Sequence, residues 1–473
     1  MKFDINIKNF GKTKQAKLKV SPFTVIAGSN SSGKSFVSRA LYSFFSTINQ
    51  DHVTKSAIKS LSSIRVVLSS ARYSLNSPSQ TVSFLHTELT QLVEDLEHTI
   101  NREYGQCTYI EQFSRIVVIE EKLQNIEIVK NELIKEIAGT KKYTGYLDKV
   151  SLISSLLQKF KLTINEPDKV LSESIEKGFN DALKENFQVT NLSDLKSFGC
   201  SSKDKIEFDF GSLGVIKISG ESIGFQLAAQ SVNDFQSLYN VVFLESPIYW
   251  KLRKPLTRAK EGNSLFRNSR RLHKENEALC GVPQYFFDML DLLDINIKSN
   301  QSSTDNVSLY NRINDVVGGE LDISESGDIF FKDGGTAKNI NINLTASGVT
   351  NLGIIALLLK RNVIAKGSFL FVDEPEVNLH PAWQKVMIEI LYHLSQNGIN
   401  VVIASHSIDM MKYIENIMSE LDDEYIENHF SINHLASNGE SISDSDSHPL
   451  QELSKIKEDL GAPFYNMLLE GGW

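Results

Sequence analysis

Residues 28–35 read Gly-Ser-Asn-Ser-Ser-Gly-Lys-Ser, a complete G-x-x-x-x-G-K-S segment, and they directly follow an apolar strand predicted at 23–27. Gly28 and Gly33 allow the backbone to turn its N–H groups toward phosphate, and the helix that follows directs its positive end the same way. We expect Lys34 to reach the β- and γ-phosphates and the Ser35 hydroxyl to hold Mg²⁺. This phosphate loop therefore predicts a nucleoside triphosphate site. Its candidate nucleotide-binding residues are Gly28, Ser29, Asn30, Ser31, Ser32, Gly33, Lys34, Ser35 and Phe36.

A second group of reactive side chains follows two apolar strands far along the chain. Asp373 and Glu374 end the run 368–372, and His406 follows the run 400–404. Unpaired buried charge is costly, so adjacent acids at a strand end indicate a cation or a reaction there. We assign Asp373 to the Mg²⁺ shell, Glu374 to the attacking water as its base, and His406 to the γ-phosphate. The plainer alternatives are acids merely exposed at a strand end and a structural histidine. The candidate catalytic residues are Glu374, His406 and Lys34.

The elements that must position these residues alternate between sheet and helix. Residues 3–9 and 15–20 predict a β-hairpin before the phosphate loop, and residues 50–190 follow helical periodicity. Strand patterns return after residue 205, with helices expected at 284–297 and 305–317. Short strands are expected at 319–323, 328–332 and 338–344. The predicted division is 1–50 for the first part of a nucleotide-binding core, 51–190 for a helical insertion, 191–435 for the rest of the core, and 436–473 for a tail with terminal helices.

The helical insertion has two interpretations. Ile116, Ile119, Leu123, Ile126, Leu133 and Ile137 follow heptad spacing, which allows either helices packed on each other or a coiled coil that binds a partner. Lys130, at a heptad core position, weakens the coiled-coil interpretation. We therefore expect helices folded back on one another.

The composition argues against a disulfide-stabilised protein, a cysteine zinc site and a membrane-spanning protein. The 473 residues carry a mild net charge of −9, and the three cysteines, Cys107, Cys200 and Cys280, form no C-x-x-C pair. No apolar run approaches the roughly 20 residues that a bilayer requires, and the N-terminus lacks the layout of a signal peptide. A cytoplasmic protein without membrane contact is expected. The segment 251–274 contains nine lysines and arginines and only one acid, Glu261, so nucleic-acid contact by this segment is possible.

The motifs together resemble an ABC-type ATPase of the SMC-like and OLD-like branch. The resemblance is carried by the phosphate loop with Asn30, the block from Asp373 to Pro381 (Asp-Glu-Pro-Glu-Val-Asn-Leu-His-Pro), and Ser405-His406-Ser407. The opening 7–11 and the ending 462–465 are similar to soluble bacterial members. The resemblance implies an α/β fold, an ABC-ATPase-like P-loop core of mixed sheet and flanking helices that carries a large helical insertion.

The same resemblance places a degenerate signature motif at Leu344-Thr345-Ala346-Ser347-Gly348. In such ATPases, the signature of one copy completes the nucleotide site of the other, so Ser347 and Gly348 are expected to bind nucleotide across a head-to-tail homodimer or a higher homo-oligomer. Val377 to His380 would lie at that seam. An ordinary helix cap by Thr345 or Ser347 is the alternative. The family's glutamine lid motif has no convincing match in this sequence, and three residues are weak candidates for it: Gln226, Gln230 and Glu245.

For function, the resemblance implies an ATP-driven switch that controls a partner effector, a nuclease or toxin, as in OLD-like, Septu-like and PARIS-like anti-phage systems. Only a short tail follows His406, and its Asp444 and Asp446 lie in a loop-like stretch rather than a nuclease-type acid cluster. The alternative is a DNA repair or recombination ATPase that clamps DNA through 251–274. A transporter subunit is disfavoured, because the helical insertion is atypical there.

Overall fold

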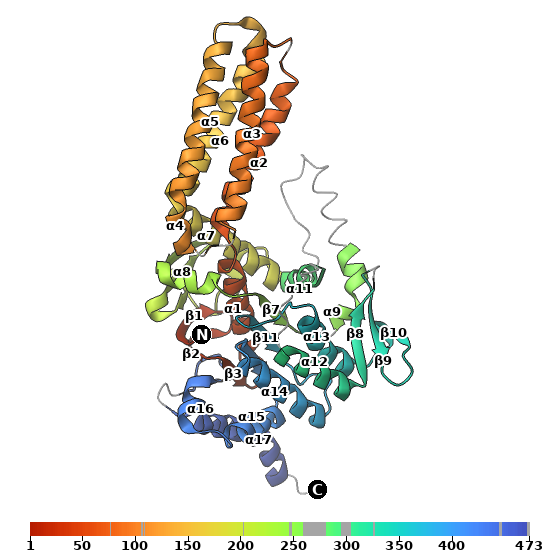
Figure 1. The fold of residues 1–473 in the computed structure, drawn as a ribbon. Coiled ribbons are helices and arrows are strands. Elements are labelled where there is room, and N and C mark those ends of the chain that lie inside the picture. The colour runs from red at the N-terminus through yellow and green to blue at the C-terminus, as the bar shows by residue number, and fades with distance from the viewer. Residues whose placement is uncertain are drawn as a thin grey trace. The chain divides into compact units, whose positions relative to one another are not determined.

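The computed structural model describes residues 1–75, 77–105, 107, 109–201, 203–245, 248–258, 281–294, 304–324, 327–443 and 447–470. These fall into two compact units: a core unit of residues 1–47, 179–226 and 238–473, and a helical unit of residues 48–178 and 227–237 (Figure 1). Most of the basic segment 251–274, Cys280, Asp444 and Asp446 lie outside the described residues. The functional division made from the sequence stays a prediction.

A parallel sheet of five strands lies at the centre of the core unit. Its order is β13 (Phe430–Leu435), β3 (Phe23–Gly28), β12 (Asn400–Ser405), β11 (Phe369–Asp373), β7 (Val241–Leu244). Every residue of the five strands is buried, which explains the apolar runs of β3, β7, β11 and β12. In β13, the buried residues include the polar Ser431, Asn433 and His434. Because all five run the same way, their carboxyl ends meet at one edge. That edge receives the phosphate loop, the acid pair and His406.

Helix α1 (Lys34–Ile48) lies between this sheet and a second one. On one side, Phe45 contacts Phe369 with ring centroids 4.8 Å apart. On the other, Phe44 stacks on Phe210 at 4.7 Å. The second sheet is antiparallel where its pairing is resolved, in the order β2 (Thr13–Val20), β1 (Phe3–Phe10), β4 (Ile206–Asp209), β5 (Gly214–Ser219), β6 (Ser222–Leu227). These two aromatic side chains near the end of α1 therefore pack the helix against both sheets.

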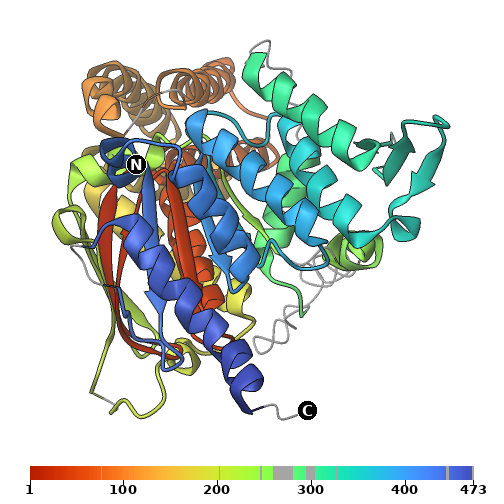
Figure 2. The same cartoon turned by 90° about the horizontal axis from the view of Figure 1, so that it is seen from below.

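The opposite face of the parallel sheet carries the C-terminal helices. Figure 2 shows α14 (Pro381–Gln396), α15 (Ile408–Met418) and α17 (Pro449–Glu470), coloured blue, side by side along it. Tyr392 of α14 packs on Phe23 and Phe430, and α16 (Asp423–His429) precedes β13. Thus the tail expected at 436–473 includes one helix, α17, that packs on β13 and α15.

The rest of the core unit surrounds α13 (Ser347–Lys360), which packs on α12 (Thr304–Val317) and on β8. A small antiparallel sheet joins β8 (Gly319–Ile323), β9 (Ile329–Asp333) and β10 (Asn339–Asn341), and short helices α9 (Ile248–Lys251) and α11 (Gln284–Asp294) follow β7. The expected strand 338–344 is too long, because residues 342–344 form a 3-10 turn. The other two short strands lie within one residue of their predicted places.

The helical unit contains four long helices packed on one another: α2 (His52–Arg72), α3 (Gln80–Glu103), α5 (Ile116–Ile137) and α6 (Thr144–Asn165) (Figure 1). It also includes α4 (Tyr109–Ser114), α8 (Ala229–Gln236) and the first part of α7 (Pro167–Phe187). The heptad assignment of Lys130 is wrong, because Val129 is the buried residue and Lys130 is partly exposed. Within the described ranges, no helix is both long and apolar enough to cross a bilayer.

Candidate functional site

The phosphate loop leaves the end of β3 as a tight cradle. A Cβ atom on Gly28 would lie 2.3 Å from the carbonyl oxygen of Leu435, and Gly33 has a φ of +99°, so neither position accepts an ordinary side chain. Lys34 is buried, and its Nζ donates to the carbonyl oxygens of Gly28 and Ser29, both at 2.9 Å. Within the described chain, the buried Ser32 hydroxyl has no hydrogen-bond partner. Close backbone approach and spare donors fit a bound triphosphate.

Burial also changes the charge behaviour of the cradle. It lowers the pKa of Lys34, while the carboxylates of Glu374, Asp373 and Glu376 act against that shift. These acids come from the other end of the sequence. The loop and the acid block therefore share one electrostatic environment, in which a triphosphate would supply the missing counter-charge for the lysine.

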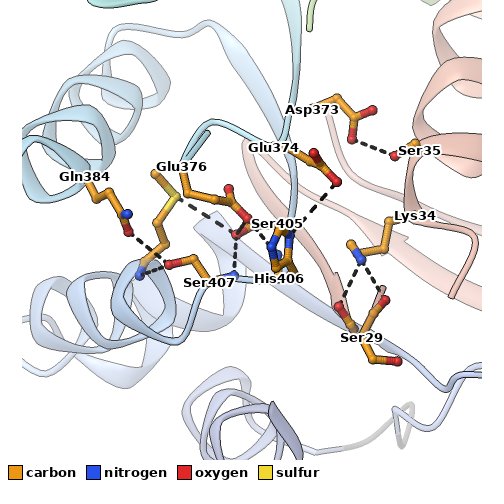
Figure 3. Close-up of polar contacts among 12 residues, drawn as sticks. Ser29, Lys34, Ser35, Asp373, Glu374, Glu376, Gln384, Ser405, His406 and Ser407 are labelled. Atoms are coloured by element: carbon orange, nitrogen blue, oxygen red, sulfur yellow. Dashed lines mark hydrogen bonds and ion pairs between the residues drawn. The ribbon is translucent and has the colours of Figure 1, made fainter. Parts of the chain in front are cut away.

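The expected metal ligands are in contact. The Ser35 hydroxyl donates to Asp373 Oδ1 at 3.0 Å, joining the first turn of α1 to the end of β11 (Figure 3). Asp373 is buried, and burial raises its pKa to about 7, against which the Ser35 hydrogen bond acts. A hydroxyl and a carboxylate are hard oxygen donors of the type that Mg²⁺ prefers. The donor set fits that ion.

Glu374 has a different environment from its neighbour. Its φ is +50°, its N–H donates to the Ala404 carbonyl at 2.8 Å, and its side chain is 44% exposed. The unusual backbone turns the Glu374 side chain away from the buried position that Asp373 occupies. His406 Nδ1 lies 4.0 Å from Glu374 Oε1. The structure therefore brings together the three expected elements: the loop, the acid pair and the histidine.

The sequence reasoning gave no role to Glu376, which is buried beside His406. Its Oε1 accepts from the Ser405 hydroxyl at 3.0 Å and from the His406 N–H at 2.9 Å, and it lies 3.1 Å from His406 Nδ1 (Figure 3). A third acid two residues after Glu374, in a short turn between buried elements, was the available signal. Only the adjacency of β11 and β12 shows that this turn faces His406.

Of the three lid candidates, Glu245 lies at the site. It follows β7, whose Leu244 pairs with Val372, and its carboxylate forms an ion pair with Arg39 at 3.0 Å and accepts from the Tyr285 hydroxyl. A cavity of about 30 Å³ lies between Glu245, the acid pair and Trp250. Gln226 lies on β6 of the antiparallel sheet, and Gln230 lies on α8 of the helical unit.

The signature segment begins α13 at Ser347. Ala346 is the N-cap residue, with no side-chain cap bond, so the alternative of an ordinary cap by Thr345 or Ser347 is wrong. A Cβ on Gly348 would lie 3.2 Å from the Asn378 carbonyl oxygen, so this glycine allows α13 to approach the turn at 377–379. The role of Ser347 and Gly348 in nucleotide binding stays a prediction.

His380, expected at the dimer seam, caps a helix in this chain. Its Nδ1 accepts from the Ala382 N–H at 3.3 Å, and Pro381 occupies the first turn of α14. Position 380 therefore has a local structural role, because its side-chain acceptor caps the first turn of α14.

The basic segment is described only to residue 258. Lys251 Nζ donates to the Thr345 carbonyl at 2.9 Å, Arg253 pairs with Asp294 at 3.0 Å, and Lys254 pairs with Asp328 at 2.5 Å. These three cations already have protein partners. Of the four cations in the described part, these three therefore give no support to a DNA-contact surface, and the fourth, Arg258, is exposed.

Several known proteins are similar to this chain. The SMC head bound to the C-winged helix domain of ScpA matches with 13% identity and a TM-score of 0.39, covering 93% of this chain and 95% of that one. The SMC head domain from Thermotoga maritima matches with 10% identity and a TM-score of 0.31, covering 87% and 91%. Another match is cbiO1 from Clostridium perfringens, part of an ABC transporter complex, with 15% identity, a TM-score of 0.24, and coverage of 54% and 78%.

Sequence comparisons add two findings. A stretch of 79 residues is 37% identical to peptide chain release factor 1 of Borrelia hermsii (strain HS1 / DAH), which is 17% of this chain and 22% of that protein, so the chain spans about a fifth of that relative. Residues 23–410 match a family described as "AAA domain, putative AbiEii toxin, Type IV TA system". That range includes the phosphate loop, the acid pair and His406. With most of its length matched and with a P-loop ATPase core in the structure, the chain belongs to this AAA-domain family.

Proposed function

We propose that this protein binds and hydrolyses Mg²⁺-ATP at the edge where the phosphate loop meets the acid pair. The observation that carries the proposal is the hydrogen bond between Ser35 and Asp373, two residues 338 positions apart in sequence. No local structural need brings a serine at a helix start to a buried aspartate at a strand end. A shared magnesium ion accounts for both, and it would neutralise charge on the β- and γ-phosphates.

Different residues of the chain would then bind the triphosphate, accept the proton from water and contact the γ-phosphate. Backbone N–H groups of the phosphate loop and the Lys34 ammonium would hold the triphosphate. Glu374, the exposed member of the acid pair, would accept a proton as a water oxygen attacks the γ-phosphorus. The bond from that phosphorus to the bridging oxygen breaks, which leaves ADP and inorganic phosphate. His406, beside Glu374, would donate to a γ-phosphate oxygen.

The wider role that fits best is a dimerising switch of the SMC-like and OLD-like branch. Ser347 and Gly348 of one copy would complete the nucleotide site of a second copy. The family description, which names a putative toxin of a Type IV TA system, supports a place in a toxin–antitoxin system. Control of a separate nuclease or toxin in anti-phage defence is proposed from the resemblance alone. The DNA-clamp alternative stays a prediction with no observation in its favour.

Replacement of Glu374 tests the assignment of the base. Glu374→Gln removes the proton acceptor but keeps the shape of the side chain, so we expect ATP binding to persist while kcat falls by about 10² to 10⁴. Lys34→Ala should instead abolish ATP binding. Phosphate release and equilibrium binding of a fluorescent ATP analogue measure the two effects.

The matched control is Glu94→Gln, the same chemical change at an exposed position of α3. It should leave both measurements unchanged. Wild-type turnover by Glu374→Gln would show that the water-activating residue lies elsewhere.

A further inference from the structure

Glu376 links two loops that the sequence separates by some thirty residues. It lies in the turn after β11, whereas the three groups that converge on its Oε1 belong to the loop after β12. These groups are the Ser405 hydroxyl, the His406 N–H and His406 Nδ1. Glu376 is 8% exposed, so water competes little for this carboxylate. Its contacts therefore fix the position of the His406 ring relative to the acid pair.

A second set of hydrogen bonds holds the same loop from the other side. The Ser407 hydroxyl donates to Gln384 Oε1 at 2.9 Å (Figure 3). Gln384 Nε2 in turn donates to the Leu379 carbonyl at 3.2 Å. The Ser407 N–H donates to the Ser405 hydroxyl at 3.1 Å. The backbone around His406 is thus anchored to α14 and to the turn after β11. The ring nitrogen Nδ1 then lies within 4.0 Å of two carboxylates, those of Glu376 and Glu374.

Two carboxylates compete for the same ring nitrogen. His406 Nδ1 lies 3.1 Å from Glu376 and 4.0 Å from Glu374. The contact of Nδ1 with Glu376 is an ion-pair distance and not a formed hydrogen bond. It is the shorter of the two contacts, so the Glu376 carboxylate lies closer to this nitrogen than the Glu374 carboxylate does.

We propose that Glu376 is a positioning residue that holds His406 by Nδ1 and thereby keeps the histidine from forming an ion pair with Glu374. The inference rests on the proposed ATPase function, in which Glu374 must accept a proton from water. A base already paired with a histidine N–H is a poorer acceptor. With Nδ1 committed to Glu376, Nε2 is the ring nitrogen left to face the triphosphate.

The first test is Glu376→Gln. The amide oxygen can still accept from Ser405 and from the His406 N–H, but it lacks the charge that outcompetes Glu374. We expect kcat for ATP to fall about 10- to 100-fold, the size typical of losing a group that orients a functional histidine, with the ATP affinity unchanged. Glu389→Gln on α14 is the matched control and should leave kcat unchanged.

A double-mutant cycle separates positioning from a general structural effect. If Glu376 acts only through the histidine, Glu376→Gln should have no further effect in a His406→Gln background. The double variant would then match His406→Gln alone. Losses that multiply in the double variant would overturn the proposal.

Nitrogen-15 NMR of labelled histidine gives a readout that does not depend on turnover. Wild-type His406, assigned by its absence in His406→Gln, should show a protonated Nδ1 whose resonance moves in Glu376→Gln and not in Glu389→Gln. An unchanged resonance would overturn the inference. If the wild type hydrolyses no ATP, the proposed function fails, and the NMR comparison still decides whether Glu376 holds the ring.

Discussion

At the scale of single residues, the acid pair shows how two neighbours acquire different roles. Asp373 ends a strand buried on both faces, whereas the left-handed backbone of Glu374 turns the next side chain toward solvent. Burial raises the pKa of Asp373 to about 7, so its ionised form is destabilised until a cation compensates it. The same burial that costs the free protein stability makes this carboxylate a strong site for a metal ion.

Stability in the absence of metal should therefore depend on pH through Asp373. Its folded pKa of about 7 lies above the ordinary 3.8, so the folded state binds the proton more tightly, and stability is lost as pH rises from about 4 to about 7. Asp373→Asn cannot ionise. In EDTA at pH 8, we expect this variant to be more stable by up to roughly 4 kcal/mol, with the difference gone at pH 4.

Thermal unfolding at the two pH values measures this difference. Asp148→Asn, a change at an exposed position of α6, serves as the control. Added Mg²⁺ with a non-hydrolysable ATP analogue should raise Tm for the wild type more than for Asp373→Asn. Equal stability of the wild type and Asp373→Asn at pH 8 would rule out the burial penalty.

The functional residues that could be predicted from the sequence are those that have partners nearby in the chain or belong to a continuous motif. The phosphate loop depends on its own backbone, so its glycines and Lys34 were identifiable from spacing alone. Glu376 was missed because its partners lie beyond a whole helix and strand in sequence. Glu245 remained a weak candidate for the same reason: its position depends on the pairing of β7 with β11 and on Arg39.

At the scale of elements, strand and helix positions followed from hydrophobic pattern, whereas their neighbours did not. Apolar runs predicted β3, β7, β11 and β12, but no local pattern specifies the order of five parallel strands. In α5, the choice between Val129 and Lys130 depends on how the helix faces its neighbours in the bundle. The boundary of β10 was missed because residues 342–344 continue the pattern as a 3-10 turn.

Helix α13 provides a prediction at this scale. Gly348 faces the Asn378 carbonyl and the side chains of Leu379 and Trp383, where a methyl group would lie at 3.2 to 3.3 Å. Gly348→Ala should therefore force α13 outward and lower the free energy of unfolding by about 1 to 3 kcal/mol. Ser347→Ala removes a hydroxyl that makes no cap bond, and we expect a change below about 0.5 kcal/mol.

Urea unfolding of the two neighbouring variants measures the contrast directly. Equal stability of Gly348→Ala and the wild type would show that α13 and the turn at 377–379 are not in close contact. A loss in Ser347→Ala as large as that in Gly348→Ala would instead indicate a structural role for the hydroxyl.

At the scale of the whole molecule, the proposed switch requires two copies. Ser347→Arg places a long cation where the second copy's nucleotide site would meet α13, so ATP-dependent dimerisation should be lost while each monomer still binds ATP. Sedimentation velocity of Glu374→Gln, with and without Ser347→Arg, measures assembly in ATP. Ser151→Arg, at an exposed position of α6, should leave the dimer intact. Dimers that persist with Ser347→Arg would place the contact surface elsewhere.

The position of β3 between β12 and β13 has a consequence for the synthesis of this protein. The phosphate-loop strand β3 is synthesised long before β12 and β13, the two strands that flank it in the sheet. The four long helices of the helical unit rely on contacts between nearby segments and can form in the meantime. During that interval, β3 is an unpaired apolar strand that chaperones or nascent-chain aggregation could capture. The sheet that positions the phosphate loop can therefore be completed only after residues 400–435 have emerged.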